Sequence, residues 1–448
     1  MHTIQIPEAL NDFDAGIRRD ALRKACRGAR FPEPGANFNM HCHSFFSYNA
    51  EGWSPSSVAY VCRVQGLCAA GLCDFDVLDG LEEFTEAGLR LGLRTAVHLE
   101  TRAYVPEFAE AEISSPGEPG VTYIMGCGFT RLPDPETAQA RTLARLRDGA
   151  RERNLALLGR VNAALPAIAI DYGRDVLPLT PMGVATERHI VRAYCARSRT
   201  VMPDPAERAA FWSPVLKCGT EAFAALGADV PKMEDLVRNA LAKRGGLGYI
   251  QPTAQTFPLA DDFIRWVLAC HAIPTVAWLD GTSGGEADCE RLLERMTAKG
   301  CAALNIIPDR NWNLAKPDEA ALKRAKLDEM VNAAIRRDLP INIGTEMNKG
   351  GLPFTDDLAG PVLGRYAAAF TQGMRVMVGH AVLGRYADAP YVGERARTEF
   401  ADLKRRNAFY AAVGALPALS LSQAEALSAA GPDKAFAMLA DAAAKKGR

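Results

Sequence analysis

The sequence predicts an α/β protein in which strands and helices alternate, as they do in a parallel sheet or a barrel. In residues 37–100, short apolar runs alternate with amphipathic helical segments across short connections. The same rhythm returns in residues 248–344. Between the two series, residues 133–244 show helical patterns without clear strand alternation, which indicates a helical insertion of ordinary domain size.

The first series is indicated by its helix boundaries. Ser54 can cap a helix that has Pro55 in its first turn and ends at Gly66. A second helix follows a turn and is closed by Gly92. The elements expected in this part of the chain are strands at 37–43, 67–73 and 93–100, and helices at 15–28, 54–66 and 81–92.

The later part of the chain is expected to complete the α/β unit and then become helical. The expected strands are 248–251, 274–279, 302–307 and 341–344, with helices at 259–272, 286–300 and 318–338. A long Arg-rich helix is expected at 137–164, and residues after 357 are Ala-rich and helical. The predicted organisation is a lead-in (1–36), a barrel-type unit (37–132 and 245–358), a helical insertion (133–244) and a helical C-terminal extension (359–448).

Composition limits the classes of function. The 448 residues are 48% apolar and 23% charged, as in a globular protein that can bury a full core. With 52 basic and 53 acidic residues, the net charge of −1 provides no overall basic field for long nucleic acid, although a small anionic substrate needs only local cations. The eleven cysteines form no CxxC pattern, the N-terminal segment is polar, and the longest apolar run (408–419) is too short for a membrane span. We therefore expect a soluble, cytoplasmic protein with no membrane partner.

The tripeptide His41-Cys42-His43 is the most informative short motif. Alternate side chains of a strand share a face, so both imidazoles would point the same way, which suits a divalent metal such as Zn²⁺ or Mn²⁺. A bare pair of this kind is about as often two unrelated histidines, but this pair ends the first strand of a βα series, where chemistry gathers. Glu100 and Glu346 each follow an apolar run, and each is either a metal-binding carboxylate or an ordinary surface glutamate.

Other candidates have an ordinary structural interpretation beside the functional one. His189 lies in the insertion, and a lone helical histidine is more often a packed or capping residue than a ligand. His380 either ends a further strand at the site or, as the pattern favours, lies at a strand or helix terminus in the C-terminal extension. The candidate anion contacts, each more often a solvated surface charge when taken singly, are Arg102, Arg153, Arg160, Lys243, Arg244 and Lys349.

Taken together, these segments resemble the polymerase-and-histidinol-phosphatase (PHP) family of phosphoesterases. HCHSFFSYNAEGWSP resembles the family's opening HxHSxxSxGxxSP, GLCDFDVLDGLEEF resembles its second motif TDHDTVDGLEEF, and VHLETR resembles its GxE strand. RERNLALLGRVN and MGVATERHIVRAY resemble the insertion of the branch that hydrolyses nucleotide phosphates and short RNA. GGLGYIQP, HAIPTVAWLDG and INIGTEMN follow in the order of the remaining motifs, so the resemblance spans residues 37–358 and rests on order and spacing.

The resemblance implies a distorted seven-stranded (β/α) barrel of the PHP type, with the helical insertion and the helical C-terminal extension described above. It also implies metal ions at the carboxyl ends of the strands. One metal position would be held by His41, His43, Glu100 and Glu346. A second position would share Glu100 and use His189.

Several ligand positions of the family are substituted here. Tyr48, Phe75 and Asn348 stand where ligands of a further ion would be. Tyr123, which the resemblance places on the strand after the GxE motif, and Trp278 replace histidines. We therefore expect one or two divalent ions (Zn, Mn, Fe or Mg) and not three. Tyr48, Phe75 and Asn348 are expected to lie together and fill the space of the missing ion, with the Tyr48 hydroxyl bonded to Asn348 or to water.

The leading functional hypothesis is a metal-dependent hydrolase, specifically a PHP-type phosphoesterase. A metal-activated water would act on a small anionic phosphate ester such as a nucleotide. The candidate substrate contacts are Arg102, Arg153, Lys349 and Trp278. One alternative is a catalytically silent PHP-like protein that binds a ligand or a metal without turnover. Another is a one-metal hydrolase of a non-phosphate bond.

Overall fold

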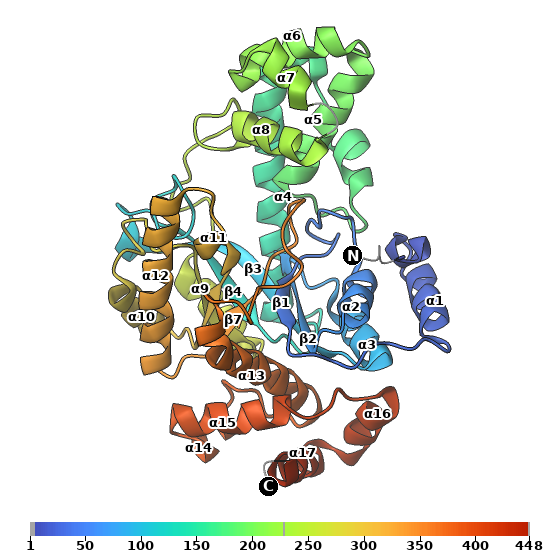
Figure 1. Cartoon of the computed structure of the whole chain (residues 1–448), viewed down its shortest axis with the longest axis vertical. Helices are drawn as coiled ribbons and strands as arrows, with labels where there is room; N and C mark the ends of the chain where they lie inside the picture. The colour runs from blue at the N-terminus through green and yellow to red at the C-terminus, as the bar shows by residue number, and fades with distance from the viewer. Residues whose placement is uncertain (1–4, 227–228, 447–448) are drawn as a thin grey trace.

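A seven-stranded sheet that curves into a nearly closed barrel forms the centre of the molecule (Figure 1). The computed structural model describes residues 5–226 and 229–446. The strands are β1 (Phe38–Cys42), β2 (Ala69–Phe75), β3 (Arg94–Tyr104), β4 (Val121–Cys127), β5 (Ile273–Trp278), β6 (Ala303–Ile306) and β7 (Ile341–Ile343), in this spatial order. A parallel bridge between Cys42 and Glu346 links the end of β7 back to β1. The α/β barrel expected from the sequence is confirmed.

The direction of one strand distorts the barrel. β4 runs antiparallel to both β3 and β5, whereas the other neighbouring strands are parallel. The sequence prediction missed this strand in the alternating pattern and placed one at 248–251 instead. That prediction was wrong, because Gly248 ends a turn in which its N–H donates to the Leu241 carbonyl, residues 249–251 are irregular, and the Ile250 side chain is exposed.

Helices cover the outside of the barrel. The Ser54 side chain accepts the Ser57 N–H and Pro55 occupies the first turn of α2, while Gly92 ends α3 with φ +64°, as their sequence signals indicate. The helices around the barrel, including the N-terminal helix and the short helix after β6, are α1 (Ala15–Cys26), α2 (Pro55–Val64), α3 (Leu81–Leu91), α9 (Ala260–Ala269), α10 (Cys289–Ala298), α11 (Asp309–Trp312) and α12 (Pro317–Arg336).

A helical lobe lies at one end of the barrel. Its members are α4 (Ala138–Ala164), α5 (Glu187–Val201), α6 (Pro205–Leu216), α7 (Thr220–Leu226) and α8 (Val230–Ala242). In Figure 1 the long α4 rises from the barrel into this lobe. The lobe has a hydrophobic cluster of its own, which includes Val161, Tyr194 and Trp212, separate from the cluster of the barrel. The two bodies can therefore enclose space between them.

The C-terminal helices cover the opposite end of the barrel (Figure 1). They are α13 (Ala367–Tyr386), α14 (Glu394–Glu399), α15 (Leu403–Gly414), α16 (Leu421–Ala430) and α17 (Pro432–Lys446). His380 lies in the interior of α13, so neither position expected from the sequence is correct. Its Nε2–H donates to the Gly128 carbonyl (2.9 Å) and its Nδ1 accepts the Tyr391 N–H (2.9 Å). His380 is thus a buried structural residue that joins the extension to the barrel.

Across residues 5–226 and 229–446, every helix is too short or too polar to cross a lipid bilayer.

Candidate metal centre and its cavity

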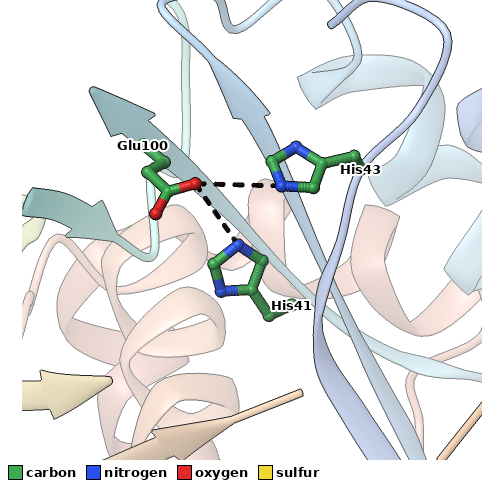
Figure 2. A group of neighbouring side chains, drawn as sticks. All are labelled: His41, His43 and Glu100. Carbon is green, nitrogen blue, oxygen red and sulfur yellow. Dashed lines mark ion pairs between the residues drawn. The ribbon is translucent and has the colours of Figure 1, made fainter. Parts of the chain in front are cut away.

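Two histidines and a glutamate meet at one end of the barrel. His41 lies on β1, His43 follows that strand directly, and Glu100 lies on β3. Glu100 Oε2 is 3.6 Å from His41 Nε2 and 3.8 Å from His43 Nε2. Figure 2 shows the three side chains pointing toward one another, and all three are buried. The two-residue spacing on one strand therefore places both imidazoles on the same side, opposite a carboxylate from a strand further along the sheet.

The hydrogen-bond partner of Nδ1 determines the tautomer of each imidazole. His41 Nδ1 lies 3.3 Å from Asn305 Oδ1, an acceptor, so Nδ1 carries the proton. His43 Nδ1 lies 3.1 Å from Ser47 Oγ, whose own hydrogen donates to Asp74 (2.6 Å), so this Nδ1 is also the donor. Both Nε2 lone pairs are therefore left facing Glu100, which is the tautomer that a metal ligand requires.

The three facing atoms have no hydrogen-bond partner. His41 Nε2, His43 Nε2 and Glu100 Oε2 are buried and unpaired in the part of the chain that the structure describes. A buried polar group left without a partner costs about 1–3 kcal/mol, so three of them at one point indicate a missing ligand. Two imidazole nitrogens and one carboxylate oxygen, mutually within 4.8 Å, form a donor set that divalent transition metals accept. The residues therefore fit a metal ion.

The electrostatics of the three groups differ. Burial, together with the neighbouring His41, lowers the pKa of His43 well below its usual value. For His41, burial alone would have the same effect, but the Glu100 carboxylate outweighs it and raises the pKa. Burial also raises the pKa of Glu100. Burial thus disfavours an isolated charge on His43 and on Glu100, whereas the Glu100 carboxylate favours a positive charge at His41, which is the sign that a bound cation would supply.

Glu346 lies beside this centre but outside the group. Its backbone carbonyl accepts the His43 N–H (2.8 Å), so its chain position is adjacent to the histidines. Its carboxylate, however, forms an ion pair with Arg310 (2.5 Å) and accepts the Asn348 Nδ2–H (3.1 Å). Burial opposes ionisation of Glu346, but the Arg310 guanidinium prevails and lowers the pKa of Glu346. The structure thus does not bring Glu346 into the set in which the sequence placed it.

His189 also has another role in the structure. It lies in the first turn of α5, where its Nδ1 accepts the Thr186 N–H (3.0 Å) in a capping box. Its ring contacts that of Tyr48 edge to face, with 5.1 Å between ring centroids. Burial, with the charge of Arg192 nearby, lowers the pKa of His189 to about 3. His189 is therefore a neutral capping residue here, and it is absent from the group of neighbouring ligand atoms.

The three side chains expected to fill a lost metal position have separate partners. Phe75 stacks on His43, with 4.8 Å between ring centroids. The Tyr48 hydroxyl donates to Glu234 (3.2 Å) and accepts from Arg192 (2.7 Å), so the expected bond to Asn348 is not formed. The insertion supplies both partners of Tyr48, which the sequence around Tyr48 does not reveal.

The centre opens into a cavity between the barrel and the helical lobe. Its volume is about 500 Å³, and it is lined by residues of both bodies. Its aromatic lining includes Tyr249, Phe257 and Trp278. The cations that line it are Arg102, Arg153, Arg160, Arg188, Arg238, Lys243 and Arg310, and the carboxylates are Asp76, Glu100, Glu118, Glu187 and Glu346. Among the described residues, cationic side chains therefore outnumber carboxylates in this lining.

Two of the expected substrate contacts form a buttressed pair in this cavity. Arg102 pairs with Glu118 (2.9 Å) and Arg153 pairs with Asp76 (3.6 Å). Both guanidinium groups also lie over the ring of Phe257, at 4.3 Å and 4.7 Å from its centroid. Such contacts hold long side chains in one geometry before a ligand arrives.

Of the other two expected substrate contacts, one lines the cavity and the other does not. Trp278 ends β5 and lines the cavity, although its Nε1 is buried without a hydrogen-bond partner. Lys349 is not part of the lining and pairs with Asp235 of α8 (2.7 Å). The structure thus assigns Lys349 to the contact between the loop after β7 and the insertion.

Some residues of the site were missed in the sequence. Asn305 lies on β6 and Arg310 on α11, and Ser47 with Asp74 completes the support of His43. A signal for Arg310 was present, because it lies in the segment that follows the expected strand at 302–307, near the carboxyl end of a strand of the βα series. No comparable signal marks the Ser47–Asp74 pair, which joins two segments 27 residues apart.

Comparison with known proteins finds only solved structures of low sequence identity. No family model and no curated protein matches this chain. Among solved structures, an amidohydrolase from Chromobacterium violaceum with bound sulfate and no metal is 19% identical, with a TM-score of 0.48, and the match covers 75% of this chain and 96% of that chain. A "putative metal-dependent phosphoesterase" from Bifidobacterium adolescentis is 20% identical, with a TM-score of 0.46 and coverage of 75% and 98%.

Proposed function

We propose that this chain is a metal-dependent hydrolase that acts on a small phosphate ester, such as a nucleotide. The observation that carries the proposal is the set of three buried, unpaired ligand atoms of His41, His43 and Glu100 beside a cavity rich in cations. A divalent ion in this set supplies Lewis acidity toward a water molecule and toward an anionic oxygen.

The support of the ligands is built into the barrel. Asn305 orients His41, and Ser47 with Asp74 orients His43, so both imidazoles present Nε2 without rearrangement. Ligands held in this way lose little freedom on metal binding. Phe75 stacks on His43 and shields one side of the centre from water.

The cavity suits a small anionic ester. About 500 Å³ is within the usual range of a small-molecule pocket. Arg102 and Arg153, already fixed over Phe257, can donate forked hydrogen bonds to phosphate oxygens. Tyr249 and Trp278 offer aromatic surface for a base or sugar ring. These contacts support the nucleotide as an example of the substrate class.

Hydrolysis of a panel of phosphomonoesters and phosphodiesters tests the proposal, with Mn²⁺, Zn²⁺ or Mg²⁺ added to metal-stripped protein. We expect metal-dependent turnover that is lost in His43→Ala. The matched control is His271→Asn, because His271 is exposed and precedes β5 at the end of that strand opposite Trp278. Metal-independent turnover, or full activity of His43→Ala, would contradict the proposal.

A second candidate is a protein that binds a metal or a ligand without turnover. The pairing of the Glu346 carboxylate with Arg310 favours it, because only His41, His43 and Glu100 then remain as a ligand group in the described residues. This candidate predicts stoichiometric metal binding to the wild type and no hydrolysis of any ester in the panel.

A further inference from the structure

Arg310 brings a fixed positive charge to the edge of the candidate metal centre. It lies on α11, just after β6, and its guanidinium pairs with Glu346 Oε2 at 2.5 Å. Arg310, Glu346 and Glu100 line the same cavity. The side chain of Arg310 is 43% exposed, compared with 9% for Glu346, so much of the guanidinium faces the cavity while its partner is buried.

The position of Glu346 is enforced by the backbone. The Glu346 carbonyl accepts the His43 N–H, and Cys42 and Glu346 form the bridge that closes the barrel. Glu346 and Met347 have φ values of +63° and +61°, a left-handed conformation that costs a residue with a side chain about 1 kcal/mol or more. A buried carboxylate is thus held beside two candidate ligands, and it needs a cation as a partner.

We infer that Arg310 takes the place of a further metal ion at this centre, because it neutralises Glu346 and presents its other N–H groups to an anionic oxygen of the substrate. The inference rests on the proposed function for the identity of that anion. A guanidinium has five N–H donors, and the ion pair with Glu346 is the one hydrogen-bonded contact that the Arg310 side chain makes within the described residues. The remaining donors are available to a phosphate oxygen, which guanidinium binds in a forked geometry.

This role differs from that of the other cavity cations. Arg102 and Arg153 are held over Phe257 by carboxylates other than Glu346. Among the described residues, Arg310 alone forms an ion pair with Glu346, the residue whose backbone carbonyl accepts the His43 N–H. Arg310 would therefore contact the oxygens nearest the reacting bond, whereas the Phe257 pair would hold a more distant part of the ligand.

Metal titration is the first test. Mn²⁺ affinity of metal-stripped protein is measured by calorimetry for the wild type, Arg310→Gln, Arg310→Lys and the control Arg336→Gln, an exposed arginine that pairs with Glu290 on the outer surface. Arg310→Gln removes a nearby cation and frees a carboxylate, so it should bind Mn²⁺ about tenfold more tightly or more. Arg310→Lys keeps the charge and should stay within about threefold of the wild type, like Arg336→Gln. An unchanged Mn²⁺ affinity in Arg310→Gln overturns the inference.

Phosphate titration is the second test and separates the inference from the proposed function. Inorganic phosphate is titrated into each protein that carries one equivalent of Mn²⁺, so no variant can load a second ion. Arg310→Gln should bind phosphate about tenfold more weakly than the wild type, and Arg336→Gln should match the wild type. Equal phosphate affinity in Arg310→Gln and the wild type overturns the role of Arg310 alone. A wild type that binds Mn²⁺ but no phosphate overturns both the inference and the phosphate-ester proposal.

Discussion

Replacing Ser47 with alanine should weaken metal binding although Ser47 is not a candidate ligand. Its hydroxyl oxygen accepts the His43 Nδ1–H and its hydrogen donates to Asp74. Without it, the buried His43 Nδ1–H loses its acceptor and the ring is free to turn or to change tautomer. Supporting residues of this kind typically contribute 10–100-fold to metal affinity, or about 1.4–2.7 kcal/mol. We therefore expect Ser47→Ala to bind Mn²⁺ or Zn²⁺ less tightly by about 10–100-fold.

Ser44 offers a matched control for this change. The Ser44 hydroxyl donates to the other oxygen of Asp74 at 2.6 Å, the same length as the bond from Ser47, but it forms no hydrogen bond with the His43 ring. Each alanine variant should lower the free energy of unfolding by about 1–3 kcal/mol, measured by urea denaturation, because each removes a buried hydrogen bond to a carboxylate. Only Ser47→Ala should also lose metal affinity, measured by competition with a chelator.

The comparison can refute the proposed support of His43. If Ser47→Ala retains the wild-type metal affinity within about twofold, the orientation of the ring does not depend on the Ser47–Asp74 pair. If Ser44→Ala weakens metal binding as much as Ser47→Ala does, the effect comes from Asp74 or from general loosening, and the tautomer argument fails.

Three further predictions follow from the same structure. His41→Ala should abolish metal retention, measured by elemental analysis, while circular dichroism shows an intact fold, because His41 contributes one of the three unpaired atoms. Gly414→Ala should destabilise the protein by about 1–3 kcal/mol or more, because a Cβ there would collide with the Arg375 carbonyl of α13. Gly159→Ala should instead stabilise it by about 0.5–1 kcal/mol, because this position in α4 has open space around it. Thermal denaturation measures both effects. Burial lowers the pKa of His380 to about 4, below the usual value of about 6.5, so the folded state prefers the neutral ring. The contribution of this preference to the free energy of unfolding is complete above about pH 6.5 and falls by about 3 kcal/mol as the pH drops to about 4. Urea unfolding from pH 8 to pH 4 should show a smaller decline in His380→Gln, and an identical decline would contradict the assignment.

The elements that could be predicted from the sequence are those with local signals. Ser54 with Pro55 and Gly92 mark helix ends through hydrogen bonds and backbone angles within a few residues, and the structure has those ends. Counting βα units passes over β4 because this strand returns antiparallel and has only the short 3₁₀ helix Pro106–Phe108 before it. The run at 248–251 was predicted as a strand because it is partly apolar, but no neighbouring strand among the described residues pairs with it or buries it.

In the candidate site, too, the features with local causes could be predicted and those with long-range causes could not. His41 and His43 face one way because a strand alternates. Glu100 reaches them because it lies on β3 where the pairing of β3 with β2 ends, although β3 itself continues to Tyr104, so a search near the expected strand ends is sufficient to find all three. That search also selects Glu346, but it cannot determine which partner the carboxylate takes. The partner is chosen by two consecutive left-handed residues and by a guanidinium 36 positions earlier in the chain, and these meet only after the barrel has closed. Strand ends can therefore predict where charged groups gather, whereas whether a carboxylate binds a metal or an arginine depends on which cation the completed fold brings to it.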